Sequence, residues 1–159
     1  MAENNGNEET VQRELLLRKI YIKDLSFESP NAPDVFSDGD LVPQTHLNLK
    51  SANREVGSNT QEVVLTITVE AKMDEKTLFL VELQQAGIFQ ITGYSKEEQR
   101  ALVGSFCPGT LYPYAREAIS EVVAKGGFPQ MLLQPINFDA LYTQAQQQAV
   151  AAEGNGGGA

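Results

Sequence analysis

The chain has 159 residues, of which 42% are hydrophobic, so it suits one domain of ordinary size and is not globally disordered. Its formal net charge of −9 argues against nucleic acid as a partner, because phosphate backbones attract clustered Lys and Arg. No apolar run is long enough to span a membrane, and the acidic N-terminus lacks the pattern of a secretory signal. We therefore expect a cytoplasmic protein without direct membrane insertion.

Both ends of the chain are expected to be disordered tails. Residues 1–12 are acidic and polar, and residues 150–159 are rich in Gly and Ala. Neither segment can bury enough apolar surface to offset the entropy of ordering it. Residues 13–149 are predicted to form a single domain in which four strands precede the helices.

The first strand is expected over about residues 15–28 and changes phase along its length. Ile20 and Ile22 would face one side, and Leu25 and Phe27 the other. The connection that follows, residues 29–43, contains three prolines and one glycine, so it is too irregular for a hairpin. Loops of that length are uncommon and often functional.

Three further strands follow. Residues 44–50 alternate cleanly, and residues 62–72 alternate over eleven positions, which predicts a strand with one buried face. Residues 73–76 indicate a hairpin turn into a return strand, residues 77–91. That strand is apolar on both faces, with Leu78 and Leu80 opposed to Phe79, so a helix layer and another subunit would cover it. Gly87 suggests a bulge or a close backbone approach.

The second half is predicted to be helical. Ser95 and Glu98 have capping-box spacing, so a helix should begin there, run to about Cys107 and break near Pro108 and Gly109. Thr110 would cap a second helix over 111–125 that stops at two glycines. After a loop over 128–136, Asn137 would cap a last helix with an apolar stripe. That stripe contains Phe138, Leu141, Tyr142 and Ala145.

Few side chains could support catalysis or a metal. Cys107 is the single cysteine and His46 the single histidine, so neither a disulfide framework nor a zinc site is expected. A Cys107–His46 nucleophilic pair would need a third orienting group, and the sequence offers none. Phosphate-binding glycine motifs are also missing from the sequence, so we expect no cofactor.

An acidic strip is predicted on one sheet face. Asp24 and Glu28 share a parity but lie about 13 Å apart at ~3.3 Å per residue, too far to act on one reacting bond. Glu82 lies near Leu80 on the matching face of the return strand. Acids beside exposed aliphatic residues indicate either an interaction surface or an ordinary solvated face.

A second set of residues has two interpretations. The long loop and the last helix could enclose an apolar groove, or the same side chains could simply pack in the core. The set comprises Phe36, Leu41, Leu47, Leu49, Phe138, Leu141 and Tyr142.

Four long motifs resemble one known family. They are IYIKDLSFESPNAP at 20–33, LQQAGIF at 83–89, FCPGTLYPYARE at 106–117 and FPQMLLQPINFDALY at 128–142. In this order they resemble SecB, the bacterial protein-export chaperone family, and the likeness covers about residues 14–142. The resemblance implies an α+β fold, with a four-stranded antiparallel sheet, helices on one face and assembly as a dimer of dimers.

The resemblance also implies a function and its residues. The protein would be no enzyme; it would hold unfolded precursor proteins and deliver them to the motor ATPase SecA. Asp24, Glu28, Leu80 and Glu82 match the SecA-binding surface. Val81, Leu83 and Gln85 match positions that affect the homotetramer. Phe36, Leu47, Leu49 and Tyr142 match the client groove, and Phe138 belongs to the same candidate set. Leu41 stands near the place where the family usually carries a tryptophan.

Two other hypotheses remain open. The same fold permits a SecB-like chaperone dedicated to a narrow client such as an antitoxin, because function depends on the site more than on the fold. A thiol enzyme built on Cys107 is the third hypothesis, and a turnover abolished by Cys107→Ala would be needed to support it.

Overall fold

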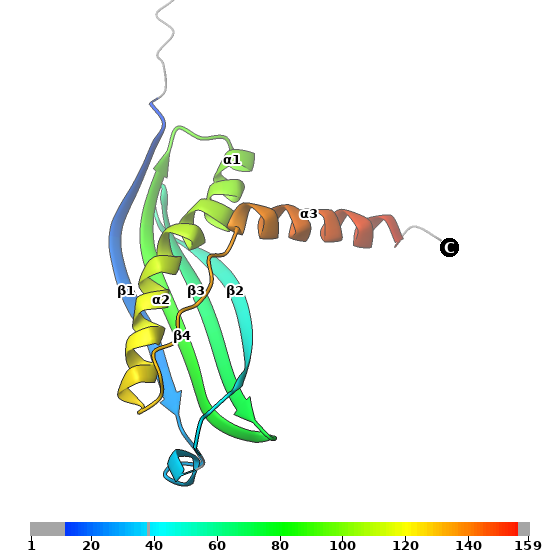
Figure 1. Cartoon of the computed structure of the whole chain (residues 1–159). Coiled ribbons are helices and arrows are strands. Elements are labelled where there is room, and N and C mark those ends of the chain that lie inside the picture. The colour runs from blue at the N-terminus through cyan, green and yellow to red at the C-terminus, as the bar shows by residue number, and fades with distance from the viewer. Residues whose placement is uncertain (1–11, 38, 156–159) are drawn as a thin grey trace, which may run out of the picture.

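The computed structural model describes residues 12–37 and 39–155. Four antiparallel strands form one sheet in the order β1-β4-β3-β2 (Figure 1). Their bounds are β1 (Glu14–Glu28), β2 (Gln44–Gly57), β3 (Thr60–Met73) and β4 (Lys76–Thr92). The predicted four-stranded sheet with helices on one face is confirmed, although β2 is longer than its alternation indicated.

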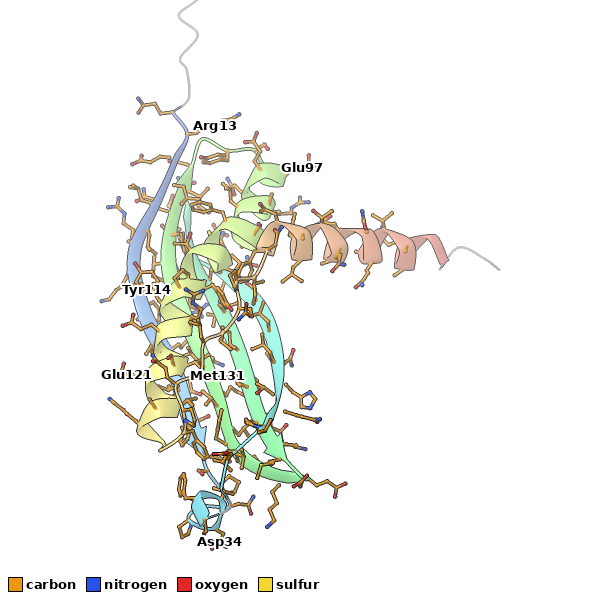
Figure 2. The ribbon with its side chains drawn as sticks, viewed as in Figure 1. Arg13, Asp34, Glu97, Tyr114, Glu121 and Met131 are labelled. Atoms are coloured by element: carbon orange, nitrogen blue, oxygen red, sulfur yellow. The ribbon has the colours of Figure 1, made fainter. Side chains whose placement is uncertain are left out.

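The helices follow the sheet in the chain. They are α1 (Lys96–Ala101), α2 (Cys107–Lys125) and α3 (Phe138–Asn155), and a short 3₁₀ helix, η1 (Asp34–Ser37), lies in the long loop. In Figure 1, α2 lies along one face of the sheet, while η1 and α1 lie at opposite ends of the molecule. Asp34 and Glu97 mark these two ends in Figure 2. The opposite face of the sheet carries no helix, and we call it the open face.

The core lies between α2 and the sheet. Alternate β3 side chains from Val63 to Ala71 are fully buried, as are Leu111 and Ile119 of α2. Each such side chain contributes about 1.5–3 kcal/mol through burial. The expected close approach at Gly87 is confirmed, because a Cβ there would lie 2.9 Å from the Leu111 side chain. The alternation predicted for β3 is therefore confirmed: its odd-numbered side chains from Val63 to Ala71 are buried beneath the helix layer, and the even-numbered side chains between them lie on the open face.

Two bulges correct the phase of β1. The register shifts between Leu17 and Lys19 and again between Ile22 and Asp24. Each bulge adds one residue to β1 and so reverses which face the following side chains occupy. As a result Ile20 and Ile22 face the helix layer, and so do Leu25 and Phe27. The expectation that Ile20 and Ile22 face away from Leu25 and Phe27 is therefore wrong. Their partners on β4 are Gly87, Gln85, Leu83 and Val81, which all share the helix-covered face.

The β3–β4 hairpin forms as predicted. Asp74 and Glu75 both have positive φ, 49° and 67°, which is the backbone of a two-residue turn that matches the sheet twist. A register shift between Ala71 and Lys72 lies beside the turn. It places Leu78 in the same cavity as Phe79, so the expectation that these two residues face opposite ways is wrong.

The helix break predicted at Pro108 and Gly109 does not occur. Instead α1, a π turn and α2 form one continuous helix, which we call the helical rod. The capping box of Ser95 and Glu98 begins α1 as predicted, but a π turn (Leu102–Phe106) then leads directly into α2. The Cys107 amide still bonds five residues back, to the Leu102 carbonyl, so Pro108 stands where the wider π spacing gives way to the α-helix. Thr110 does not cap a helix, because its hydroxyl donates to the Phe106 carbonyl at 2.9 Å.

The C-terminal third follows the expected order. Gly126 caps α2 and Gly127 has a φ of 88°. Residues 128–137 then cross the helix-covered face between α2 and β2 (Figure 1). Asn137 begins α3 by accepting from the Ala140 amide at 3.0 Å. Helix α3 continues to Asn155, past the tail boundary expected at residue 150, and the expected tail residues 1–11 and 156–159 lie outside the described residues.

Candidate functional site: a groove along β2

An apolar cavity of about 220 Å³ lies at the η1 end of the helix-covered face. Its walls come from the long loop (residues 29–43), from strands β2 and β4, and from the segment over residues 128–137, which we call the crossing segment. The lining residues are Leu41, Pro43, Thr45, Leu78, Phe79, Phe128, Pro129, Gln130 and Met131. Phe128 packs between two other rings, 5.3 Å from Phe36 and 5.1 Å from Phe79 between centroids. Phe36 itself is 47% exposed, so this aromatic cluster has one face in solvent.

The β2 strand connects this cavity with a second one. Its odd-numbered residues pair with the buried face of β3, so they share the helix-covered side. Thr45 lines the first cavity, whereas Asn53 lines a second, more polar cavity of about 660 Å³. Leu47 and Leu49 lie between them, and Leu47 is 45% exposed. We call this path from Thr45 to Asn53, which has a cavity at each end, the β2 groove.

The far end of the β2 groove meets α3. Tyr142 and Gln146 of α3 line the second cavity together with Val103 and Gly104 of the helical rod. The remaining lining residues are Asn53, Glu55, Gln61, Lys96, Gln99 and Arg100. Polar and aromatic groups therefore replace the aliphatic walls at this end, and both α3 and the rod position them.

The structure brings most of the expected groove residues onto one path. Phe36 and Leu41 lie at one end, Leu47 and Leu49 in the middle, and Tyr142 at the other end. Phe138 differs, because it is 9% exposed and packs edge-on against Tyr112, 5.5 Å between centroids. Of the two interpretations, core packing describes Phe138, whereas Phe36 and Leu47 remain open to solvent.

Sequence reasoning missed Phe128 and Met131. Both line the apolar cavity, and Met131 lies on the crossing segment (Figure 2). A signal for them exists, because residues 128–136 combine two prolines with five other apolar side chains in a loop. The same combination singles out the loop over 29–43.

The predicted acidic strip lies on the open face. Glu28 stands opposite Leu80, and Glu82 stands between Ser26 and Thr68 on its two neighbouring strands. Asp24 lies one pair further along, opposite Gln84. Glu70, which the sequence did not single out, extends the strip on the other side of Leu80. Within residues 12–37 and 39–155, no ion pair involves Asp24, Glu28 or Glu82, so their charges are directed at solvent.

A buried acid lies further along the same open face. Glu62 is only 6% exposed, accepts a hydrogen bond from the Tyr21 hydroxyl, and lies 2.9 Å from Lys23 Nζ and 3.7 Å from Arg54 Nη2. The hydrogen bonds from Tyr21 and Lys23 hold the pKa of Glu62 below its ordinary 4.5, although burial opposes them. Burial, then the bond to Glu62, raises the pKa of Tyr21 to about 12. This cluster ties both edge strands to β3.

We expect Glu62→Gln to destabilise the fold at neutral pH by about 1–3 kcal/mol, because it removes charge-assisted hydrogen bonds from a buried site. A carboxyl whose pKa is lowered on folding stabilises above its unfolded pKa and loses that contribution as pH falls. The difference between variant and parent should therefore shrink below pH 4.5. Urea unfolding at about pH 7 and about pH 3.5 checks this, with exposed Glu55→Gln as the control. Equal stabilities at neutral pH would contradict the assignment.

The expected assembly residues are internal in the single chain. Val81 and Leu83 are fully buried beneath α2, and Gln85 is 4% exposed. Gln85 Nε2 donates to the Tyr21 carbonyl of β1 at 3.1 Å. These residues thus fix the position of β1, which is an edge strand.

The structure does not bring Cys107 and His46 together. Cys107 is buried against the helix-covered face, and burial raises the pKa of its thiol to about 12. His46 pairs with Glu70 on the open face. In the described part of the chain, no group of three or more potential ligands is placed to hold a metal ion. Among the helices of residues 12–37 and 39–155, none has the length and hydropathy to cross a bilayer.

Comparisons with known proteins agree with this architecture. Residues 8–149 match the family model described as preprotein translocase subunit SecB. The protein-export protein SecB of Nitrosococcus oceani is 48% identical over 96% of both chains. That of Alcanivorax borkumensis is 51% identical over 89% of this chain and 92% of its own. A solved SecB-like chaperone from Mycobacterium tuberculosis, in complex with a peptide from the HigA1 antitoxin, matches with a TM-score of 0.64. It is 16% identical and covers 77% of this chain and 90% of its own.

Proposed function

This chain belongs to the SecB family of protein-export proteins, and we propose that it holds unfolded precursor proteins in the cytoplasm and delivers them to SecA. The observation that carries the proposal is the β2 groove. In its aliphatic middle, between an aromatic cavity and the Tyr142 end, Leu47 is 45% exposed and Leu49 is half-buried.

The groove suits a chain that has not folded. An unfolded precursor exposes apolar side chains and backbone groups together, and burial of apolar surface gains about 25 cal/mol per Å² whatever the order of residues. Because β2 is an edge strand, the outer backbone groups of β2 can also pair with an extended segment. Met131 adds an unbranched, adaptable side chain to the cavity wall, which favours breadth over selectivity.

We assign delivery to the acidic strip on the open face. Glu28 and Glu82 flank Leu80, and Asp24 lies further along the strip, opposite Gln84, so a basic partner segment would find a row of negative charges beside an apolar contact. The groove and the strip lie on opposite faces of one sheet. A client and SecA could therefore be bound at the same time, which a transfer step requires.

Assembly as a homotetramer, a dimer of dimers, is also proposed. Along the edge strand β1, Leu17, Ile22 and Leu25 are 38–49% exposed on the helix-covered side. On α2, the Ser120 hydroxyl is buried beside a hollow of about 730 Å³ and has no hydrogen-bond partner among the residues that the structure describes. Both features are typical of surfaces that another copy covers. Val81, Leu83 and Gln85 would act on this assembly through the position of β1.

A narrow antitoxin client is not favoured. The likeness to the Mycobacterium tuberculosis chaperone concerns the fold, whereas the relatives at 48% and 51% identity are export proteins. Identification of the proteins that co-purify with this chain would distinguish a general export chaperone from one dedicated to an antitoxin. Many unrelated exported precursors support the proposal, and a single antitoxin would contradict it.

Light scattering of an aggregating, chemically unfolded precursor tests the holding function. We expect scattering to be suppressed without ATP at about one assembly per precursor, because one groove in each subunit would add avidity along a long client. The mass of the free protein in solution, expected near four times 17.4 kDa, gives the number of subunits. Unchanged aggregation at a large excess of this protein would contradict the function.

A further inference from the structure

Within residues 12–37 and 39–155, helix α3 contacts the rest of the molecule near its N-terminal end. Its main contacts are with the π turn, Leu102–Phe106, and beyond Tyr142 its described side chains are exposed. Figure 1 shows the helix projecting away from the sheet and α2. The direction of α3, and thus the position of Tyr142 in the groove, depends on this attachment.

The first contact at the attachment needs a glycine. Gly104 lies in the π turn, and a Cβ at this position would be 2.5 Å from Tyr142 Cδ2 and 2.6 Å from Cε2. Real Cβ atoms essentially never come so close to a ring carbon. Tyr142 therefore rests directly on the backbone of the rod. Gln146 Nε2, one turn further along α3, donates to the Tyr142 hydroxyl at 3.1 Å.

The second contact is polar and lies beside the first. Ser105 is only 7% exposed, and its hydroxyl donates to the Asp139 carboxylate in the first turn of α3. A buried hydroxyl without a partner is costly, so this bond favours one orientation of the helix. A π turn presents consecutive residues differently from an α-helix, and such turns occur frequently at functional sites.

The root of α3 is fixed separately. Phe138 packs on Tyr112 of α2, and the Tyr112 hydroxyl donates to the Gln134 carbonyl in the crossing segment. The root holds the first residue of α3 in place but leaves its direction to contacts further along the helix. Those contacts are Gly104–Tyr142 and Ser105–Asp139.

We propose that the π turn is a joint, in which Gly104 and Ser105 set the direction of α3 and thereby the shape of the Tyr142 end of the β2 groove. The assignment of this groove to clients rests on the function proposed above, whereas the joint itself rests on the contacts of Gly104 and Ser105. Both are positioning residues, since they act on a client through Tyr142.

Gly104→Ala and Gly109→Ala form a matched pair for the test. Both substitutions add one methyl group to the same helical rod and raise helix propensity alike. A Cβ at Gly109 would meet only Phe138, at an ordinary 3.7 Å. Spin labels at Gln148→Cys and Lys50→Cys report the direction of α3 relative to β2. Cys107 is buried and should remain unlabelled. Mixing the labelled protein with an excess of unlabelled protein leaves at most one labelled chain in each assembly, so that the measured distances are those within one chain.

We expect Gly104→Ala to shift or broaden the distance distribution by several ångströms and to weaken client binding at least threefold, while Gly109→Ala matches the parent in both. Ser105→Ala and Asp139→Asn should each broaden the distribution and provide the test if Gly104→Ala does not fold. Unchanged distances in these variants would overturn the joint. Altered distances with parental client affinity would overturn its link to the groove. A parent that binds no unfolded client would instead contradict the proposed function, and the distances would still test the joint.

Discussion

Leu47→Asp should weaken the binding of an unfolded precursor at least tenfold and leave the fold intact. Leu47 lies in the middle of the β2 groove, and its side chain is 45% exposed, so the folded chain depends little on it. A bound client would bury that side chain, and each ~1.4 kcal/mol lost is a factor of ten in affinity. A buried carboxylate adds a desolvation cost. Titration with a fluorescent unfolded precursor measures the effect.

Val56→Asp is the matched control for this result. Val56 lies on the same strand, is 43% exposed and lines neither cavity. The substitution also places a carboxylate on an exposed aliphatic position of β2. We expect parental affinity. If both variants bind equally well, or lose affinity equally, clients do not use the groove as described.

Glu82→Lys should reduce SecA binding at least tenfold at low salt without altering client binding. The charge reversal falls between Ser26 and Thr68 on the open face, one pair from Leu80, where a basic segment would dock. Like charges across an interface are strongly unfavourable, and rim charges also set the rate of association. Calorimetric titration of SecA into the chaperone at two salt concentrations measures the affinity and its dependence on salt.

Glu97→Lys provides the control for charge alone. It makes the same change in net charge on α1, at the end of the molecule opposite η1 (Figure 2). The effect of Glu82→Lys should fade as salt rises, because screening removes the attraction between exposed charges. A SecA affinity that falls equally in both variants would mean that net charge, not the acidic strip, attracts the partner.

Much of the fold follows from local patterns. The alternation of β3, the turn at Asp74 and Glu75, the capping box at Ser95 and the cap at Asn137 are all set by residues close in sequence, and the structure confirms each of them. Parity along the strands likewise predicts that the acidic strip shares one face, as the pairing of β1 with β4 confirms. Short-range physics suffices where one element decides the outcome.

The predictions from sequence are wrong where packing against another element determines the local structure. The apparent change of phase in β1 is real in the sequence, but two bulges against β4 restore one apolar face. Pro108 predicts a break, and the π turn removes the need for one. Phe138 and Tyr142 share a predicted stripe, yet Tyr112 buries the first while the rod holds the second at the groove. Nothing local distinguishes these cases, because packing partners far along the chain determine them.

Methyl NMR of the chaperone with and without a bound unfolded precursor shows directly which surface of the molecule the precursor occupies. If precursors bind in the β2 groove, the methyl resonances of Leu41, Leu47, Leu49 and Met131 shift on binding, along the path from the apolar cavity toward Tyr142. The methyl resonances of Val56, which lies on the same strand outside both cavities, should keep their chemical shifts. Shifts confined to the open face, or spread evenly over the molecule, would show that precursors do not bind in the β2 groove.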